Sequence, residues 1–366
     1  MHYQELPTPA LTIDLDILEN NLERMAAYCE SHKLKLRPHA KTHKTPQIGR
    51  MQIDRGAIGL TVAKTGEAQV MAAAGLDDLL IAFPVFGSET VRKLAGLTLD
   101  HHVLISLDDE ATAQALSQAL QKQRAGASLD VLVEFDAGFG RCGLTAGPAL
   151  VCLANKIRRM PRLRFRGLMT FFGHVWGPED LRRKAMRAVA SQVELAIETF
   201  QKNGIPLEIV SGGSTPSASF SHEIPGLTEI RPGTYALNDL NTVYQGVCSY
   251  NDCAARVVTT VVSTAIPGRA ITDAGSKALS SDPLKAGPCK DYGYVVEAPD
   301  IRVFALSEEH GHLDVTRSTH KFHVGDVISV IPNHVCSCVN MHDEVFTVRH
   351  GEVLGSWPIA ARGKIR

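Results

Sequence analysis

One lysine stands where the sequence favours covalent chemistry. The apolar-alternating stretch 33–36 predicts a strand, and Lys41 lies in the basic run 37–44 that follows it. The charged and titratable neighbours of this lysine are Arg37, His39, His43 and Lys44. Neighbouring positive charge disfavours the ammonium form of an amine, and a Schiff base with an aldehyde requires the neutral amine. The run therefore predicts either a reactive lysine or a basic loop that merely faces water.

A turn of small polar residues supplies a second chemical element. Gly213, Ser214 and Thr215 follow the apolar run 207–210 and offer unhindered backbone N–H groups and two hydroxyls, which suit a phosphate. Any tight turn could use the same residues, so the motif gains meaning only from its position. On one rim with Lys41, it predicts a lysine that holds an aldehyde beside a loop that holds its phosphate. That combination indicates pyridoxal phosphate (PLP).

A histidine and a cysteine near the C-terminal end form the third element. His334 and Cys336 lie two residues apart after an apolar run, and such positions point the same way in an extended segment. Imidazole and thiolate suit a borderline metal such as zinc, and two protein ligands leave positions open for substrate. The alternative is a structural histidine with inert buried cysteines. A second donor cluster, 309–312, predicts either further ligands or a turn.

The elements that must position these residues alternate along most of the chain. Short apolar runs predict strands at 34–36, 58–63, 79–85, 103–107, 131–135, 167–172, 207–210 and 227–230. Helical periodicity lies between them, at 65–74, 109–123, 148–159 and 178–203. Alternating strands and helices favour a parallel sheet, and eight units in roughly 200–250 residues match a (β/α)8 barrel. An open doubly wound sheet is the alternative, but its glycine-rich dinucleotide motif is missing after the first strand.

A second part of different character follows at about residue 250. Short β-branched runs occupy 256–264, 269–273, 292–297, 301–306, 327–331, 344–348 and 353–359. We predict an α/β protein, with a TIM-type (β/α)8 barrel over residues 11–249 and an all-β domain over residues 250–366 together with residues 1–10. An early strand at 11–14 precedes a helix over 15–31, for which Asp14 or Asp16 is the expected N-cap.

In such a barrel, reactive side chains cluster at the carboxyl ends of the strands. Lys41 follows the first predicted strand, Arg141 the fifth and His174 the sixth. The runs 211–217 and 231–235 follow the seventh and eighth, where barrel phosphate sites are commonly built.

Composition excludes several other classes of protein. The chain has 366 residues, 44% of them hydrophobic and 21% charged, which is ordinary globular usage. Its net charge of −1 gives no global field for nucleic acid or anionic lipid. The N-terminal residues do not form a signal peptide, and no stretch reaches the length of a membrane span. Eight scattered cysteines favour reduced thiols in the cytoplasm. We expect a small-molecule substrate, with no nucleic acid and no membrane as partner.

Together, the motifs resemble the fold-type III PLP enzymes, and more narrowly the D-serine dehydratase and D-threonine aldolase group, which shares its barrel with alanine racemase. The similarity runs nearly end to end. The motifs that carry it are 37–42, 134–143, 211–216, 231–235, 273–275, 309–312 and 332–336. The resemblance implies an N-terminal barrel, a C-terminal β domain and a head-to-tail homodimer with the site near the interface.

The resemblance also implies roles for single residues. Lys41 would carry the PLP aldehyde, Arg141 would approach its phenolic oxygen, and His174 would lie near the ring and contact substrate. The phosphate would be held by Gly213, Ser214, Thr215, Gly233, Thr234 and Tyr235. His334 and Cys336 would bind a divalent metal, and a thiolate ligand favours zinc over manganese or magnesium. Arg231 matches a position that contacts the pyridine nitrogen in the racemases.

The metal pair also bears on the reaction. In the group that this chain resembles, the aldolases have the pattern His-x-Asp at the metal pair and the dehydratases have His-x-Cys. This chain has His334-Val335-Cys336 and so resembles the dehydratases. We predict a PLP- and metal-dependent lyase that converts D-serine, D-threonine or D-3-hydroxyaspartate to a 2-oxo acid and ammonia. The alternatives are an aldolase giving glycine and an aldehyde, with His174 a candidate base; a racemase using Tyr292 or Tyr294; and a non-catalytic PLP carrier. Phe171, Phe172 and Cys338 depart from the pattern of these relatives, which leaves the substrate side chain open.

Overall fold

The computed structural model describes residues 1–123, 127–284 and 290–366. The chain divides into two compact units. We call Met25–Lys41, Pro46–Gly233 and Gly363–Arg366 the barrel unit. We call Met1–Arg24, Thr42–Thr45 and Thr234–Arg362 the β unit.

Eight parallel strands form a ring in the barrel unit. Hydrogen-bonded neighbours follow the order β2-β10-β9-β8-β6-β5-β4-β3, and a parallel bridge between His39 and Thr61 joins the two ends of this order. The strands are β2 (Lys35–Leu36), β3 (Leu60–Val62), β4 (Leu79–Ile81), β5 (Val103–Leu107), β6 (Leu129–Asp136), β8 (Leu163–Met169), β9 (Ile209–Gly212) and β10 (Glu229–Ile230). A further short strand, β7 (Leu144–Thr145), pairs with β6. The predicted (β/α)8 barrel is confirmed.

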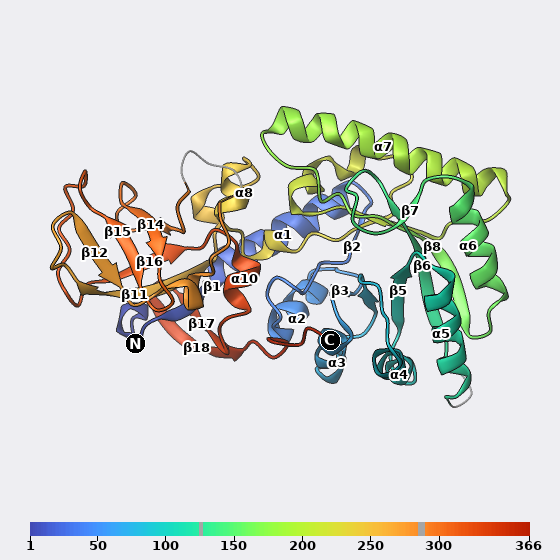
Figure 1. Ribbon diagram of the computed structural model, residues 1–366, viewed down its shortest axis with the longest axis horizontal. Coiled ribbons are helices and arrows are strands. Elements are labelled where there is room, and N and C mark those ends of the chain that lie inside the picture. The colour runs from blue at the N-terminus through green and yellow to red at the C-terminus, as the bar shows by residue number, and fades with distance from the viewer. Residues whose placement is uncertain (124–126, 285–289) are drawn as a thin grey trace. The chain divides into compact units, whose positions relative to one another are not determined.

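Helices connect these strands and cover them from outside. They are α1 (Leu15–Ser31), α2 (Pro46–Asp54), α3 (Thr65–Ala73), α4 (Ser88–Leu97), α5 (Glu110–Gln121), α6 (Pro148–Arg159) and α7 (Glu179–Lys202). Helices α4 to α7 lie on the outer side of the barrel strands (Figure 1). Asp14 Oδ1 accepts a hydrogen bond from Ile17 N at 3.2 Å, so Asp14 rather than Asp16 caps α1.

The connection between β9 and β10 is a 3-10 helix, η2 (Thr215–Glu223), and not an α-helix. Pro216 has no N–H to donate. Ser217 Oγ donates to Ser214 O at 3.1 Å, and Ser221 Oγ donates to Ser217 O at 3.0 Å. Hydroxyls that bond back to the main chain compete with regular helix formation. This sequence therefore yields a tight turn whose first residues sit at the carboxyl end of β9.

Apolar side chains from adjacent strands pack the inside of the barrel unit. Leu80, Leu104, Leu132 and Met169 form one cluster, and each is fully buried. Replacing a leucine of such a cluster with alanine costs about 2–5 kcal/mol of stability. This core holds the strand ends that carry the candidate site at fixed positions.

The β unit contains a nine-stranded sheet in the order β12-β15-β14-β13-β16-β11-β1-β17-β18, and a β12–β11 pairing closes part of it into a ring. Its strands are β1 (Ala10–Asp14), β11 (Ala255–Ser263), β12 (Arg269–Thr272), β13 (Tyr294–Val295), β14 (Arg302–Leu306), β15 (Gly311–Asp314), β16 (Val327–Ile331), β17 (Glu344–Arg349) and β18 (Glu352–Pro358). Its short helices are η1 (Tyr3–Glu5), η3 (Thr234–Ala236), α8 (Leu240–Tyr244), η4 (Tyr250–Asp252), α9 (Ser276–Leu279) and α10 (Val335–Val339). Each run predicted as a strand in this part contains a strand, although only Tyr294–Val295 of the run 292–297 is one.

One strand of the β unit was not predicted. β15 begins within the donor cluster 309–312, where His312 pairs with Ile271 and Ala305. His312 Nε2 lies 3.0 Å from Ser307 Oγ, and Glu309 forms an ion pair with Lys277. For the donor cluster 309–312, the prediction of a turn fits the residues just before β15. No contact that the structure describes supports the alternative prediction that these residues bind a metal. Within the described ranges, no helix combines the length and apolarity needed to cross a membrane.

Candidate active site

Lys41 follows β2 at the carboxyl end of the barrel strands. Strand hydrogen bonds fix the backbone that leads to it, because Ala40 N donates to Thr61 O at 2.8 Å. Lys41 N itself lies 3.4 Å from His39 Nδ1. The side chain is half-buried, and Nζ lies 5.7 Å from the centroid of the Phe171 ring, which follows β8. The amine therefore faces an aromatic wall that is built by a different strand of the same rim.

Arg37 does not act as the uncompensated positive neighbour that the sequence suggested. Its Nε donates to both carboxylate oxygens of Glu229 at 3.2 Å, and its Nη1 forms an ion pair with Asp78. Burial lowers the pKa of Arg37, but these two carboxylates more than offset that effect and raise it. This part of the sequence prediction is wrong. Arg37 instead anchors the strand that leads to Lys41.

The loop after β6 brings Arg141 to the same aromatic wall. Its guanidinium lies 4.5 Å from the centroid of Phe171, and the ring of Phe139 meets Phe171 edge-on with centroids 5.4 Å apart. Asp136 Oδ1 accepts hydrogen bonds from the backbone N–H groups of Gly138, Phe139 and Gly140 at 3.2, 2.8 and 3.0 Å. The loop is therefore folded around one carboxylate. Lys41 and Arg141 both lie over Phe171, at distances typical of cation–π contacts.

His174 lies beside this loop with one ring nitrogen unused. Nδ1 is buried and finds no hydrogen-bond partner among the described residues. A Cβ on Gly138, which has φ +115°, would lie 3.4 Å from Nε2. Burial lowers the pKa of His174, although Asp136 opposes this. A neutral imidazole with a buried, unbonded nitrogen can accept a proton from a bound molecule.

The glycine-serine-threonine turn opens η2 at the carboxyl end of β9. Gly213 has φ +89°, a left-handed conformation that favours glycine, and a Cβ there would lie 3.4 Å from Ile230. Ser214 N donates to Ser217 Oγ at 2.9 Å, so this N–H is already used in a capping box. Thr215 is buried at the first position of η2. The start of a helix with a close backbone approach is suited to an anion.

The residues 233–235 are consecutive in the chain but belong to both units. Gly233 ends a segment of the barrel unit, whereas Thr234 and Tyr235 open η3 in the β unit. Gly233 and Tyr235 are buried.

Arg231 is fixed within the barrel and is not free at its mouth. It donates to Thr170 O at 2.8 Å and to Ser211 Oγ, and Ser211 Oγ donates to Glu229 at 2.6 Å. Burial lowers the pKa of Arg231 to about 10. A continuous chain of hydrogen bonds thus runs from Arg231 through Glu229 to Arg37.

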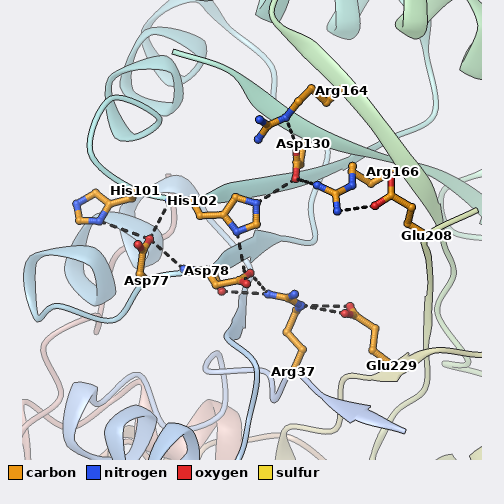
Figure 2. A network of polar contacts seen from close by, with 10 residues as sticks. All are labelled: Arg37, Asp77, Asp78, His101, His102, Asp130, Arg164, Arg166, Glu208 and Glu229. Carbon is orange, nitrogen blue, oxygen red and sulfur yellow. Dashed lines mark hydrogen bonds and ion pairs between the residues drawn. The ribbon is translucent and has the colours of Figure 1, made fainter. Parts of the chain in front are cut away.

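The amino end of the barrel carries an ion-pair network that sequence reasoning missed. Asp130, which is buried, accepts hydrogen bonds from His102 Nε2 at 3.0 Å, Arg164 Nε at 2.6 Å and Arg166 Nη1 at 2.7 Å (Figure 2). Hydrogen bonds to Asp130 and Asp78 raise the pKa of His102 to about 9. Asp78 and His102 directly precede β4 and β5, Asp130 lies near the start of β6, and Arg164 and Arg166 both lie in β8. Charged residues at the starts of neighbouring strands were therefore the available signal. Residues at this end of such a barrel serve stability.

His334 and Cys336 lie in the β unit at the start of α10. The predicted extended geometry is wrong, because His334 is the N-cap of α10 and Cys336 is inside it. Cys336 Sγ donates to Thr42 Oγ1 at 3.2 Å and lies 3.9 Å from Thr234 Oγ1. Cys338 is different: it is fully buried, its pKa is raised by burial to about 12, and it donates to a backbone carbonyl. Cys338 is therefore a structural cysteine.

Negative groups surround the imidazole of His334. Its Nδ1 lies 2.6 Å from Asp282 Oδ2. Burial lowers the pKa of His334, but Cys336, Asp239 and Asp282 outweigh burial and raise it to about 9. Within the described ranges, no group of three or more His, Cys, Asp or Glu side chains could hold a metal ion. A nitrogen and a sulfur donor in a negative environment fit a borderline divalent cation.

Comparisons with known proteins agree with this fold. The family model "Alanine racemase, N-terminal domain" matches residues 13–239, and "Putative serine dehydratase domain" matches residues 254–348. The chain is 33% identical to a D-threonine aldolase of Arthrobacter sp. over 97% of this chain and 93% of that protein. It is 32% identical to a D-threo-3-hydroxyaspartate dehydratase of Delftia sp. (strain HT23) over 91% of each.

One solved structure adds to this. It is a cysteine-to-alanine mutant of D-threo-3-hydroxyaspartate dehydratase in the metal-free form, with a TM-score of 0.90, 28% identity and 98% coverage of both chains. The fold and the lysine-bearing rim define a fold-type III PLP enzyme. More narrowly, the chain belongs to the family of D-serine dehydratase and D-threonine aldolase, and it is a PLP-dependent lyase.

Proposed function

We propose that this lyase is a metal-dependent dehydratase of D-3-hydroxy amino acids, which releases a 2-oxo acid and ammonia. D-serine, D-threonine and D-3-hydroxyaspartate are the candidate substrates. One observation carries the proposal: Thr42, the residue directly after Lys41, accepts a hydrogen bond from Cys336 Sγ at 3.2 Å. A single peptide bond therefore connects the candidate cofactor lysine to a residue in contact with the candidate metal ligand.

Residues of the barrel would hold the cofactor. Lys41 would carry the PLP aldehyde, and Arg141 would approach the phenolic oxygen. The phosphate would be held by Gly213, Ser214, Thr215, Gly233, Thr234 and Tyr235. The buried, unbonded Nδ1 of His174 and the left-handed backbone at Gly213 support a fit to such a ligand. When bound, PLP supplies an electron sink for the carbanion at Cα.

Acid–base work would fall to two side chains of the rim. The Lys41 amine would be the base for the Cα proton of the substrate. His174 would contact the substrate with a neutral imidazole, because burial lowers its pKa. The ring of Phe171 would screen the Lys41 amine from water.

His334 and Cys336 would hold a divalent cation, and the thiolate favours zinc over manganese or magnesium. A Lewis acid at this place makes the β-hydroxyl a better leaving group. The structure of a cysteine-to-alanine mutant of D-threo-3-hydroxyaspartate dehydratase in the metal-free form supports a metal in that relative. The His-x-Cys spacing at 334–336 supports the same site in this chain.

A D-threonine-type aldolase is the second candidate, favoured by the 33% identity to a D-threonine aldolase. His174 would then take the β-hydroxyl proton, and glycine and an aldehyde would be released. A racemase would need a further base. The ring of Tyr294 is stacked on Tyr250 with centroids 4.2 Å apart, and burial raises the pKa of Tyr294, which disfavours its phenolate.

Two further features belong to the proposal. The described cysteines form no disulfide, which supports a reducing, cytoplasmic setting, and the resemblance supports a homodimer. We place the PLP-binding barrel at residues 11–249, and the part that carries the metal pair at residues 250–366 with residues 1–10.

Product analysis tests the proposal. The purified, PLP-loaded enzyme is incubated with D-serine, D-threonine and D-3-hydroxyaspartate, with and without a chelator, and 2-oxo acid, ammonia, glycine and aldehyde are quantified. We expect 2-oxo acid and ammonia in equal amounts, and loss of both after chelation while the visible absorbance of the cofactor remains. Glycine and aldehyde as the main products would establish the aldolase instead. Full dehydratase activity in metal-depleted enzyme would remove the metal from the account.

A further inference from the structure

A single carboxylate orients the imidazole of the metal pair. Asp282 Oδ2 lies 2.6 Å from His334 Nδ1, although the two residues are 52 positions apart in the chain. The same oxygen accepts a hydrogen bond from Ser337 Oγ at 2.6 Å, and Ser337 Oγ lies 3.3 Å from His334 Nδ1. The carboxylate thus ties the N-cap residue of α10 to the first turn of that helix.

This contact fixes which ring nitrogen is available to a metal. An ionised carboxylate can only accept hydrogen bonds, so the proton of the imidazole must be on Nδ1. The lone pair of the neutral ring is then on Nε2. Carboxylate–histidine pairs of this kind hold the tautomer and the orientation of metal-binding histidines.

The main chain on both sides of His334 is held as well. Asn333, which is buried, donates from Nδ2 to the backbone carbonyls of Asp282 at 3.1 Å and Asp291 at 2.6 Å. The buried Asp239 accepts a hydrogen bond from Val335 N at 3.1 Å. The backbone of Asp282 and the backbone of His334 are therefore parts of one rigid arrangement, and the short contact between their side chains follows from it.

Stability does not explain the pair. The Asp282 side chain is 41% exposed and that of His334 is 33% exposed, and ion pairs that are this accessible to solvent contribute little to stability. The backbone on both sides of His334 is nevertheless held by two buried polar residues, Asn333 and Asp239, and Asn333 also bonds the backbone of Asp282. An aligned, solvent-reachable imidazole with a fixed proton is suited to an incoming cation.

We propose that Asp282 is a positioning residue for the cation site of His334 and Cys336. It holds the imidazole with Nε2 presented to the metal and is not itself a ligand. This inference rests on the proposed metal site. Nothing in the sequence around Asp282 indicates the role, because its partner lies on a distant segment.

Metal affinity tests the inference without reference to turnover. Zn²⁺ and Co²⁺ dissociation constants are measured for the full-length, PLP-loaded enzyme by competition with a chelating dye. The variants are Asp282→Asn, Ser337→Ala and His334→Ala. We expect Asp282→Asn to weaken binding by about 10–100-fold, the usual effect of losing such a partner. Ser337→Ala keeps the carboxylate–imidazole contact and is expected to change affinity less than about threefold.

The Co²⁺ absorption spectrum separates positioning from ligation. In Asp282→Asn we expect an unchanged thiolate-to-cobalt band at saturating metal, because both ligands remain. A changed spectrum at saturation would make Asp282 a ligand and overturn the inference, as would an Asp282→Asn affinity equal to that of the parent enzyme. If His334→Ala binds metal as tightly as the parent, the proposed metal site itself is wrong and the inference falls with it. Since the Asp282 side chain is partly exposed, Asp282→Asn is expected to fold, and a thermal unfolding curve checks this.

Discussion

The charged residues at the two ends of the barrel have different kinds of partner. At the amino end, the buried carboxylate of Asp130 accepts hydrogen bonds from three side chains, and one of these, His102, also pairs with Asp78 (Figure 2). At the carboxyl end, Lys41 and Arg141 lie against the aromatic ring of Phe171. The described part of the chain offers no hydrogen-bond partner to Nδ1 of His174. At the amino end the charged groups are paired with one another, although Nε of Arg166 has no partner among the described residues, whereas at the carboxyl end two cations face an aromatic ring.

This difference separates stability from chemistry within one fold. Charges that are paired in the folded protein stabilise it and have little capacity left to bind anything else. A buried nitrogen without a partner costs free energy, and a protein keeps such a group where a bound molecule completes it. Changes at the amino end should therefore lower stability, and changes at the carboxyl end should lower activity.

Lys41→Ala gives the largest expected effect. Loss of the amine removes both the covalent attachment and the base, so we expect turnover to fall by more than about 10³-fold. The visible absorbance of the bound cofactor should vanish, while the midpoint of urea unfolding of the cofactor-free protein stays unchanged. A Lys41→Ala mutant that retains activity, or one that loses mainly stability, would contradict the assignment of chemistry to the carboxyl end of the barrel.

Asp130→Asn tests the opposite end. The substitution keeps the shape of the side chain but takes the buried anion away from three partly exposed donors, which we expect to cost about 1–3 kcal/mol in the free energy of unfolding. Urea denaturation measures this, and turnover of the folded fraction should stay near that of the parent. Arg164→Gln is the control, since the Arg164 side chain is 54% exposed and should cost at most about 1 kcal/mol. Equal costs for the two variants would contradict a buried structural anion.

His174→Gln is expected to lower turnover by about 10²-fold, at the lower end of effects for a proton-transfer group. Burial lowers the pKa of His174 below its ordinary value of 6.5. The neutral form therefore predominates above that pH, and the activity of the parent should rise with pH through a value below about 6.5. This acidic limb should be absent from the pH profile of the variant. An unchanged limb would assign it to another group.

His102→Gln gives the smallest expected effect. The pKa of His102 is raised from 6.5 to about 9 in the folded state, so its contribution is fully present below about pH 6.5 and is lost as the pH rises through about 9. Its side chain is 40% exposed, so solvent screening limits the contribution to about 1 kcal/mol or less. Unfolding free energies of parent and variant should differ most near pH 6 and converge near pH 10. A difference that grows with pH would contradict the network.

Much of the fold could be predicted from the sequence, because strand and helix periodicities alternate regularly. The helix over 15–31 and the strand over 103–107 have the predicted bounds. The missed strand β15 contains histidine and aspartate in place of the β-branched residues that mark other strands. Its pairing with β12 and β14 imposes the extended form.

The candidate site was less predictable, because its geometry depends on distant segments. The type and spacing of His334 and Cys336 indicated a metal pair, but the short helix α10 and the partner Asp282 could not be derived from local sequence. Arg37 looked like a positive neighbour of Lys41 until folding brought Glu229 to it. Charge at a site depends on its partners, and partners are set by tertiary structure.

Borohydride reduction of the PLP-loaded protein, followed by digestion and mass spectrometry, tests most directly whether the carboxyl end of the barrel carries the cofactor. We expect the pyridoxyl group on the peptide that contains Lys41, with Lys44 and Lys64 unmodified. A pyridoxyl group on a different lysine, or a protein that stays colourless and unmodified after addition of PLP, would contradict the account.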